Sequence, residues 1–592
     1  MNVIANHKKL LLWESDFLYN PDSVKDLKQF FIIYNAEILL VIVAFLLVAE
    51  LFWQPAQPQT FDEWSHLLTE NAFLIALTQG SFPVSWVDSV SNYGLPLGQI
   101  AHQTTSYLGA ALLGLTQNSL LAYNLTLLIG SLLGTFLYYR FLRIYFSPLA
   151  SITAAILFTF APYRILNIYI RGAMPEFFTS GFIPLLLIGI HHLVIRRSVT
   201  GIWLIILATV LLALSHPMML VIGLSVAVFY FGYCLFRLQH WQQRFRYFFV
   251  FIGALTIGVL LASYYLLPLL VEIKYFYHGS IAISNPTYEF LQPNQFLVER
   301  WSYSYPNSPG VRESRPQLGS VELAVLLLGA AVLIWKSLTK RKTSVMMYWW
   351  LAAGITYVFL LLPTSLFAYK AFFILSGLQF PWRFLTSLVL IPPLFLAFLI
   401  DQLPEKKAAL VVIICLIAVL RFPQLYGKNY VQFPETRYQS AIVNPHGTDM
   451  NTIWSGPSYA YFPTSQKAEI IEGEGIISDL QVTPTRRIFS INAQTPVRIS
   501  DNTFYFPGWR LFVDGKEIPI EFQDQNYRGV ITYRLPAGDQ KVDLVYQNTK
   551  IRLVGKLVSV LTLMGIVGSF LFLKKYKQLT DRLVTFWLPN NL

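Results

Sequence analysis

Charged residues are scarce in this sequence. They make up 13% of the 592 residues, whereas hydrophobic residues make up 55%. A typical soluble protein carries about 25% charged residues. The shortage excludes a soluble globular enzyme, a disordered scaffold and a fibrous repeat protein. It predicts instead an integral membrane protein that crosses the bilayer many times.

Cysteines and several catalytic motifs are also rare or missing. The two cysteines, Cys234 and Cys415, lie in apolar runs, so a disulfide framework or a thiolate metal site is not expected. The chain contains no Walker-type or dinucleotide-binding glycine motif, no zinc-type His/Cys spacing and no Gly-x-Ser-x-Gly elbow. Charges are nearly absent within the apolar runs, which argues against an ion pump or a proton relay within the spans.

The basic residues follow a membrane pattern. Lysine and arginine exceed aspartate and glutamate by 44 − 32 = 12. They lie in short connections between apolar runs, as the positive-inside rule expects for cytoplasmic loops. No basic stripe with interleaved aromatic residues occurs outside these connections, so nucleic acid is not an expected partner.

Twelve apolar runs are long enough to span the membrane in a polytopic bundle. If the amino terminus is cytoplasmic, every inner connection long enough to carry charge is basic, which supports both the count and the orientation. The first run is expected to act as an uncleaved signal anchor, and both termini are then cytoplasmic. The predicted spans are 31–53, 118–139, 146–162, 177–195, 200–215, 217–236, 247–271, 320–336, 345–363, 383–401, 407–421 and 552–573.

This topology divides the chain into a multi-spanning membrane domain over residues 1–421, an outer insert over 422–551, and a final span with a cytoplasmic tail over 552–592. Within the membrane domain, residues 102–116 are short for a span. They are either a helix at the outer interface or one half of a hairpin with 118–139. The outer loops of the membrane domain are 54–117, 163–176, 272–319 and 364–382.

The outer insert 422–551 has the pattern of a β domain. Strand-like runs alternate along residues 466–505, and two further apolar runs flank Asp514-Gly515. Asp-Gly between apolar runs is a strong hairpin signal. We therefore expect a small antiparallel, β-sandwich-like domain outside the membrane.

An acidic motif follows the first span. Asp62 and Glu63 are adjacent carboxylates, and His66 comes four residues after Asp62, on the same face if the segment is helical. Either carboxylate could take a proton from an attacking hydroxyl as a general base. The alternative is a structural role at a helix start, with Thr60 or Asp62 as the cap and Glu63 in the first turn.

Three arginines on the predicted outer side run against the positive-inside pattern. Arg164 and Arg171 precede Glu176 in the second outer loop, and Arg383 follows Trp382 at the outer start of a span. Guanidinium groups there could hold a phosphate or an anionic headgroup by bidentate contacts. A structural Arg–Glu bridge is the alternative. The ring of Trp382 could contact a sugar through its apolar face.

Two histidines also stand out near the predicted outer side. His216-Pro217 interrupts two apolar runs, and is either a turn between spans or a cavity-lining histidine. His102 follows a loop rich in glycine and proline. Such irregular loops are tolerated at membrane depth where they line a cavity.

Three stretches carry a family resemblance: APYRILNIYIRGAMPEFF at 161–178, LQFPWRFL at 378–385 and YFPGWRLFVDGKE at 505–517. They resemble the bacterial membrane proteins of the 6-pyruvoyl-tetrahydropterin synthase-related domain family. The chain is similar to YfhO-like membrane proteins and, more distantly, to the glycosyltransferase-C superfamily. Pterin synthesis is not expected, because it needs a three-histidine zinc site in a soluble fold.

The resemblance implies a bacterial plasma-membrane enzyme of glycosyltransferase-C type. Such an enzyme transfers a sugar from a polyprenyl-phosphate donor to a cell-envelope glycan or lipid on the outer face. Asp62, or Glu63 in its place, would be the catalytic base, and Arg171 and Arg383 would hold the donor phosphate. A divalent metal could assist, although no residue pattern demands one. A non-catalytic glycan- or lipid-binding scaffold and a transporter or flippase of lipid-linked intermediates stay open as alternatives.

Overall fold

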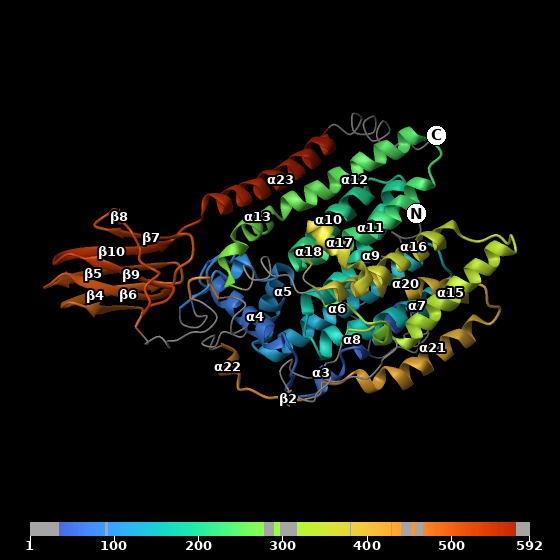
Figure 1. The fold of residues 1–592 in the computed structure, drawn as a ribbon, viewed down its shortest axis with the longest axis horizontal. Helices are drawn as coiled ribbons and strands as arrows, with labels where there is room; N and C mark the ends of the chain where they lie inside the picture. Colours follow the sequence, from blue (N-terminus) through green and yellow to red (C-terminus); the bar gives the residue numbers. More distant parts are fainter. Residues whose placement is uncertain are drawn as a thin grey trace, which may run out of the picture.

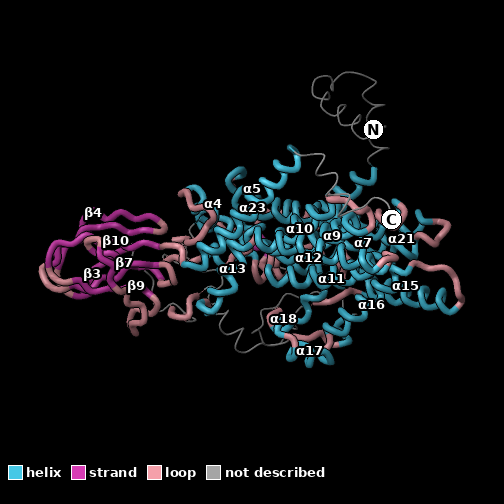
Figure 2. The backbone as a smooth tube through the Cα atoms, turned by 90° about the horizontal axis from the view of Figure 1, so that it is seen from above, coloured by secondary structure: helices cyan, strands magenta, loops and turns pink. Residues whose placement is uncertain are grey.

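The protein combines a helical bundle with a β-sheet region at one end of a long molecule (Figure 1, where the strands lie on the left). The computed structural model describes residues 35–88, 93–277, 289–296, 316–378, 380–427, 429–439, 451–455 and 466–575. Most of the predicted outer segment 272–319 and the tail after residue 575 therefore lie outside the described residues. Seen from above, the sheets again lie beyond one end of the bundle (Figure 2).

The bundle contains eight described helices that are long and apolar enough to cross a membrane, or up to ten if each of two bent helix pairs is one span. Two shorter apolar helices, Asn35–Leu46 and Thr200–Ser215, coincide with two further predicted spans. A polytopic membrane protein is thus confirmed, while the count of twelve spans stays a prediction. The principal helices are α4 (Glu63–Thr78), α5 (Gln103–Thr116), α6 (Ser119–Leu142), α7 (Pro148–Thr159), α8 (Pro162–Tyr169), α9 (Met174–Val194), α10 (Thr200–Ser215), α11 (Pro217–Phe236), α12 (Trp241–Leu261), α13 (Ser263–Glu272), α15 (Ser320–Leu338), α16 (Val345–Leu361), α17 (Leu366–Ala371), α20 (Ile391–Ile400), α21 (Lys406–Leu420), α22 (Glu435–Gln439) and α23 (Lys550–Lys575).

Prolines start several of these helices. Pro148, Pro162, Pro175 and Pro217 each lie in the first turn of α7, α8, α9 or α11. Proline suits this position, because its ring presets the helical φ and the missing N–H has no partner in the first turn. The break between α7 and α8 bends this helix pair by 40°. It leaves the short α8 at the end of the pair, next to α9.

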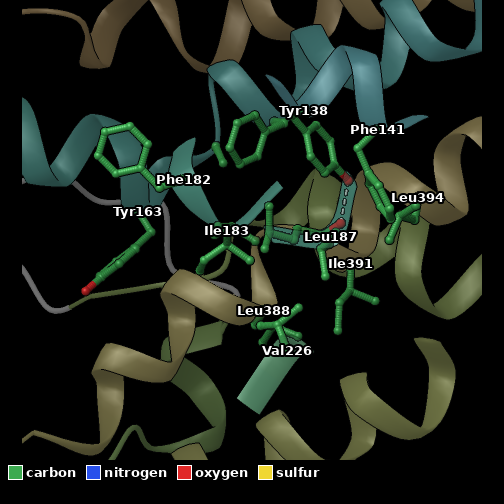
Figure 3. Packing of buried hydrophobic residues seen from close by; sticks show 14 of the residues in the cluster. Tyr138, Phe141, Tyr163, Phe182, Ile183, Leu187, Val226, Leu388, Ile391 and Leu394 are labelled. Carbon is green, nitrogen blue, oxygen red and sulfur yellow. Dashed lines mark hydrogen bonds between the residues drawn. The ribbon is translucent and has the colours of Figure 1, made fainter. Parts of the chain in front are cut away.

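Two helical segments form the centre of the bundle. In the apolar stretch of α9, 89% of the residues are buried, and in that of residues 381–400 the share is 94%. In α23 only 11% are buried. Figure 3 shows side chains from several helices meeting there, with the Tyr163 hydroxyl pointing out of the apolar cluster. The labelled residues are Tyr138, Phe141, Tyr163, Phe182, Ile183, Leu187, Val226, Leu388, Ile391 and Leu394.

The β region consists of two antiparallel sheets that share an apolar core, in agreement with the predicted sandwich. One sheet has the strand order β4-β5-β10-β7-β8 and the other β3-β6-β9. The predicted hairpin at Asp514-Gly515 is confirmed, since Val513 pairs with Lys516 across it. The strands are β3 (Ala468–Glu472), β4 (Gly475–Thr483), β5 (Arg486–Ala493), β6 (Val497–Phe504), β7 (Trp509–Val513), β8 (Lys516–Ile518), β9 (Val530–Leu535) and β10 (Gly538–Tyr546).

The sheets begin later than the predicted boundary at residue 422. Residues 430–431 form β2 (Tyr430–Val431), which pairs with β1 (Gln57–Pro58) of the first predicted loop. Farther on, Phe433 packs edge-on against Trp64 of α4, with ring centroids 4.9 Å apart. This part of the insert lies along the helical bundle, because its apolar side chains bury against the first loop and not against the sheets.

The first predicted loop, 54–117, joins the bundle to the β region. It contains α4 and α5, which pack together and against α6. Beyond α4, the buried Trp86 contacts Trp509 and Tyr546 in the β-region core, at ring-centroid distances of 5.1 and 5.0 Å. The Tyr93 ring stacks on Phe504 of β6 at 4.4 Å. The two parts therefore share buried apolar surface, which the hydrophobic effect stabilises.

An ion cluster fastens the same loop to the sheets. Arg487 of β5 is fully buried and makes a very short contact with the Asp88 carboxylate. Arg487 Nη2 also donates to Thr503 Oγ1 at 3.1 Å, and Lys467 Nζ lies 3.3 Å from Asp88 Oδ1. Asp88 is therefore the carboxylate through which two cations of the β region hold the loop, and we call these three residues the loop latch.

Removing the carboxylate of the loop latch tests this role. We expect Asp88→Ala to destabilise the protein by about 2 kcal/mol, because the buried Arg487 loses its nearest counter-charge. Thermal unfolding midpoints of the purified full-length chain in detergent measure the effect. Glu517→Ala is the matched control, since it breaks the exposed pair Arg510–Glu517 and should leave the unfolding midpoint almost unchanged. Equal midpoints for the two variants would contradict the latch.

Candidate functional site

Glu63 closes a capping box at the start of α4. The Thr60 N–H donates to Glu63 Oε2 at 2.8 Å, and the Thr60 hydroxyl donates to the same oxygen. In return, the Glu63 N–H donates to Thr60 Oγ1 at 3.1 Å. This reciprocal pairing is the capping arrangement foreseen as the alternative for the acidic motif. Burial raises the pKa of Glu63 from 4.5 to about 7.

Asp62 lies where the first loop meets the connection between α8 and α9. It is half-buried, and its N–H donates to the Arg171 carbonyl at 2.9 Å. The neighbouring Phe61 N–H donates to the Ile170 carbonyl at 3.2 Å. Gly172 makes this approach feasible, because its φ is +66° and a Cβ there would lie 2.2 Å from Thr60 Oγ1. The acidic motif and the second outer loop are thus held together by their backbones.

A single carboxylate, that of Glu176 at the start of α9, binds both predicted phosphate-holding arginines. Arg171 donates from Nη1 to Glu176 Oε2 at 2.6 Å and from Nη2 to Oε1 at 3.1 Å. Arg383 donates from Nε to Glu176 Oε1 at 2.9 Å. The structure therefore brings together residues that are more than 200 positions apart in the sequence, in a buried two-to-one ion pair.

Neighbouring side chains fix the two guanidinium groups. The Tyr163 hydroxyl donates to Glu176 Oε2 at 3.0 Å, and Arg171 Nη1 donates to Asn167 Oδ1 at 2.8 Å. The Arg171 guanidinium also lies over the Trp382 ring, 4.4 Å from its centroid. Although burial alone would lower the pKa of Arg171, the carboxylates of Glu176 and Asp62 raise it above its usual value. Arg171 is therefore a permanent cation next to Asp62.

Arg383 and Trp382 reach the same place from the start of the second central segment. They belong to the short helix η6 (Pro381–Phe384). Arg383 Nη1 donates to the Leu378 carbonyl at 2.9 Å, and the Trp382 indole N–H donates to Glu289 Oε2 at 3.2 Å. The Phe380 and Trp382 rings stack at 5.0 Å. Trp382 thus holds one arginine through its face and the exposed Glu289 through its edge.

Three histidines from distant segments approach the arginines. The rings of His66 on α4 and His102 before α5 have centroids 6.3 Å apart, and those of His102 and His216 are 4.7 Å apart. His216 lies in the break between α10 and α11 and is 9% exposed. Arg383, Glu176, Arg171 and His66 all lie within electrostatic range of His216. We call His66, His102 and His216 the histidine row.

The predicted site residue Arg164 has different partners. It is fully buried, it donates to Ser180 of α9, and it lies between the Phe158 and Phe177 rings at 4.4 and 4.5 Å. Ser180 is one helical turn after Glu176, so Arg164 lies deeper along α9 than the other two arginines. Its aromatic partners stabilise the cation by cation–π contacts.

No group of three or more His, Cys, Asp or Glu side chains that could hold a metal ion is found among the residues that the structure describes. The sequence predicted Arg171, Glu176, Trp382 and Arg383 as site residues. It did not predict Tyr163 and Asn167, which complete this arginine cluster. A spacing signal for both existed, because Tyr163, Asn167 and Arg171 recur every four residues and share one helix face. His102 could not be placed, since nothing in its own segment indicates that it meets His216.

The raised pKa of Glu63 predicts a pH-dependent stability. Between the unfolded value of 4.5 and the folded value of about 7, the folded chain keeps a proton that the unfolded chain has lost. Stability from this group is therefore greatest at low pH and falls as pH rises from 4.5 to 7, by an amount on the order of 3 kcal/mol. Glu63→Gln keeps the cap and should remove this fall.

Thermal unfolding midpoints of purified wild type and Glu63→Gln between about pH 5 and 8 measure the difference. We expect the unfolding midpoint of the variant to rise relative to that of the wild type as pH increases through this window. Glu517→Gln, on the exposed surface of the β region, serves as the control and should run parallel to the wild type. Parallel curves for Glu63→Gln as well would show that Glu63 does not titrate there.

Comparison with known proteins adds the family. The profile of the 6-pyruvoyl-tetrahydropterin synthase related domain, described as a membrane protein, matches residues 105–427. No curated protein matches the chain. The matched residues include Arg171, Glu176, His216 and Arg383, while α4 and the β sheets lie outside the match. Since the match covers more than half of the chain, the protein belongs to the 6-pyruvoyl-tetrahydropterin synthase related domain family of membrane proteins.

Proposed function

We propose that the protein is a glycosyltransferase of glycosyltransferase-C type in the bacterial plasma membrane. It takes a sugar from a polyprenyl-phosphate donor and transfers it to a glycan or lipid of the cell envelope on the outer face. In this proposal both termini are cytoplasmic, and the β region together with the Asp62 end of the bundle faces outward. The membrane supplies the donor, because a polyprenyl chain keeps its phosphate at the interface.

One observation carries the proposal: a half-buried carboxylate, Asp62, is held next to a two-arginine cluster. A backbone hydrogen bond from the Asp62 N–H to the Arg171 carbonyl joins the two segments, and the Asp62 carboxylate lies within electrostatic range of the Arg171 cation. A sugar phosphate needs both, since the attacking hydroxyl must lose a proton while the leaving phosphate gains negative charge. Asp62 is the better base, because Thr60 already occupies the Glu63 carboxylate.

The mechanism assigns a role to each group. Asp62 accepts the proton of the acceptor hydroxyl, whose oxygen attacks the anomeric carbon from the side opposite the phosphate. Arg171 and Arg383 stabilise the charge that develops on the phosphate. The apolar face of Trp382 lies on Arg171 and helps to keep this guanidinium in place. Glu176 keeps the arginines in place until an anion competes for them.

A second candidate is a non-catalytic scaffold that binds glycan or lipid. The observation in its favour is that Glu176 already satisfies Arg171 bidentately and Arg383 through Nε. A cluster of this kind can be a purely structural joint between α8, α9 and η6. The two candidates differ in whether Asp62 is needed for more than folding.

The deciding experiment is mass spectrometry of envelope glycans and polyprenyl-linked sugars in a strain that lacks the protein. Complementation by wild type should restore a missing sugar, whereas Asp62→Asn should not, at equal protein abundance. Glu63→Gln is the matched control and should restore it, because glutamine keeps the cap. Full restoration by Asp62→Asn would remove the enzymatic proposal and favour the scaffold.

The phosphate role of Arg383 gives a separate prediction. Arg383→Lys keeps the cation but loses the planar fork that binds phosphate and Glu176 together. We expect at least a tenfold lower transfer in the same assay, corresponding to about 1.4 kcal/mol of lost stabilisation. Arg510→Lys, at an exposed position of β7, should transfer at the wild-type level. Wild-type transfer by Arg383→Lys would show that charge alone suffices.

A further inference from the structure

The residues of the histidine row have no role in the mechanism proposed above. Only nine histidines occur in the chain, yet His66, His102 and His216 come together from three segments. His66 lies one helical turn after Asp62, on the same face of α4. His216 lies at the other end, among Arg171, Arg383 and Glu176. The row therefore connects the proposed base with the proposed phosphate site.

His216 has an unused polar atom at this place. Its side chain is buried, and Nδ1 has no hydrogen-bond partner among the described residues. A buried polar atom without a partner costs free energy, so it calls for a ligand or a water. The neighbouring arginines disfavour a charged imidazole unless an anion enters. An anion held by Arg171 and Arg383 would supply both the partner and the countercharge.

We propose that the histidine row carries a proton between Asp62 and a lipid-linked phosphate, with His216 as the group that touches the phosphate. This inference rests on the proposed function and names the path of its proton. The spacing is suitable for imidazoles linked directly or by water, since the ring centroids are 4.7 Å apart for His102 and His216 and 6.3 Å apart for His66 and His102.

The step balances in atoms and charge. The acceptor oxygen forms the new bond to the anomeric carbon and gives its proton to Asp62. The bond between that carbon and the phosphate oxygen breaks, and its electron pair stays on the phosphate. The proton then passes along the row from Asp62 to the phosphate oxygen, so the product leaves as a hydrogen phosphate ester. Asp62 is again a carboxylate, and no net charge builds up in a site of low dielectric constant.

The charged and titratable side chains that lie around His216 among the described residues are consistent with this path. Arg171 and Glu176 face it from the α8–α9 connection and α9, and Arg383 from η6. The His102 ring, just before α5, lies tilted against the His216 ring, with His66 beyond. With a phosphate dianion bound, the two arginines and Glu176 leave a net charge of −1 in this group. That charge favours the uptake of one proton at His216.

The first test measures protons taken up on binding, and does not depend on sugar transfer. Farnesyl phosphate, a short prenyl monoester, is titrated into purified full-length protein in detergent at about pH 7.5, in two buffers of different ionisation enthalpy. The free ester is mostly a dianion there, because its second pKa is about 6. We expect the wild type to take up close to one proton per ligand.

His216→Gln should bind farnesyl phosphate about tenfold more weakly and take up almost no proton. His192→Gln, at the far end of α9, is the matched control and should behave as wild type. Equal proton uptake in His216→Gln and wild type, with both proteins folded by size-exclusion chromatography, would overturn the proposal. So would the absence of binding, or inorganic phosphate binding as tightly as farnesyl phosphate.

The second test separates the row from the phosphate site. His102→Phe keeps an aromatic ring at the contact with His216 but cannot carry a proton. We expect unchanged farnesyl phosphate affinity and proton uptake, together with at least tenfold lower sugar transfer in the complementation assay. Normal transfer by His102→Phe would overturn the path while leaving the glycosyltransferase proposal standing. Conversely, if no sugar depends on Asp62 but His216-dependent proton uptake is found, the phosphate site stands and the transferase proposal fails.

Discussion

The Glu176 carboxylate is the contact on which the arrangement of the candidate site depends. It accepts hydrogen bonds from Arg171, Arg383 and Tyr163, and so joins α8, α9 and η6 at one point. Without this carboxylate, burying the Arg171 and Arg383 cations would cost folding free energy. Removing one member of such a buried cluster costs several kcal/mol. The same carboxylate also limits the site, because an incoming anion must compete with it for both arginines. In the proposed function, stability and phosphate binding are therefore coupled through this one side chain.

The position of α4 follows from this contact and from the β region. The backbone bonds of Phe61 and Asp62 to residues 170–171 hold the start of the helix against the arginine cluster. Beyond the helix, Trp86 and Asp88 anchor the loop in the β sheets. The first loop is thus fixed at both ends, by polar contacts to the bundle and by apolar burial in the β region. A loop that carries a reacting group needs this rigidity, since small displacements of a base reduce its efficiency.

Hydropathy and turn chemistry predicted much of the fold, and pairwise contacts account for what they missed. Apolar runs located the helices because burial in lipid requires them, and Asp514-Gly515 located a hairpin because of its backbone preference. The capping role of Glu63 was foreseen, since Thr60 and Glu63 are only three residues apart. The boundary at residue 422 was not, because composition does not reveal that Phe433 packs on Trp64. His102 and His216 were named singly, but their contact depends on tertiary packing that no local pattern encodes.

Two other buried ion pairs show what a structural joint looks like in this bundle. Glu322 pairs with Arg421 at 2.7 Å, and Glu272 pairs with Arg552 at 2.9 Å, each as one carboxylate with one arginine. Such one-to-one pairs cancel their charge within the pair. Glu176 instead serves two arginines, and a buried histidine with an unpartnered nitrogen stands beside them. In the proposed function, the positive charge that Glu176 alone leaves uncancelled favours the binding of an anion here. It also explains why Asp62 lies next to Arg171, since a carboxylate there balances the site while no phosphate is bound.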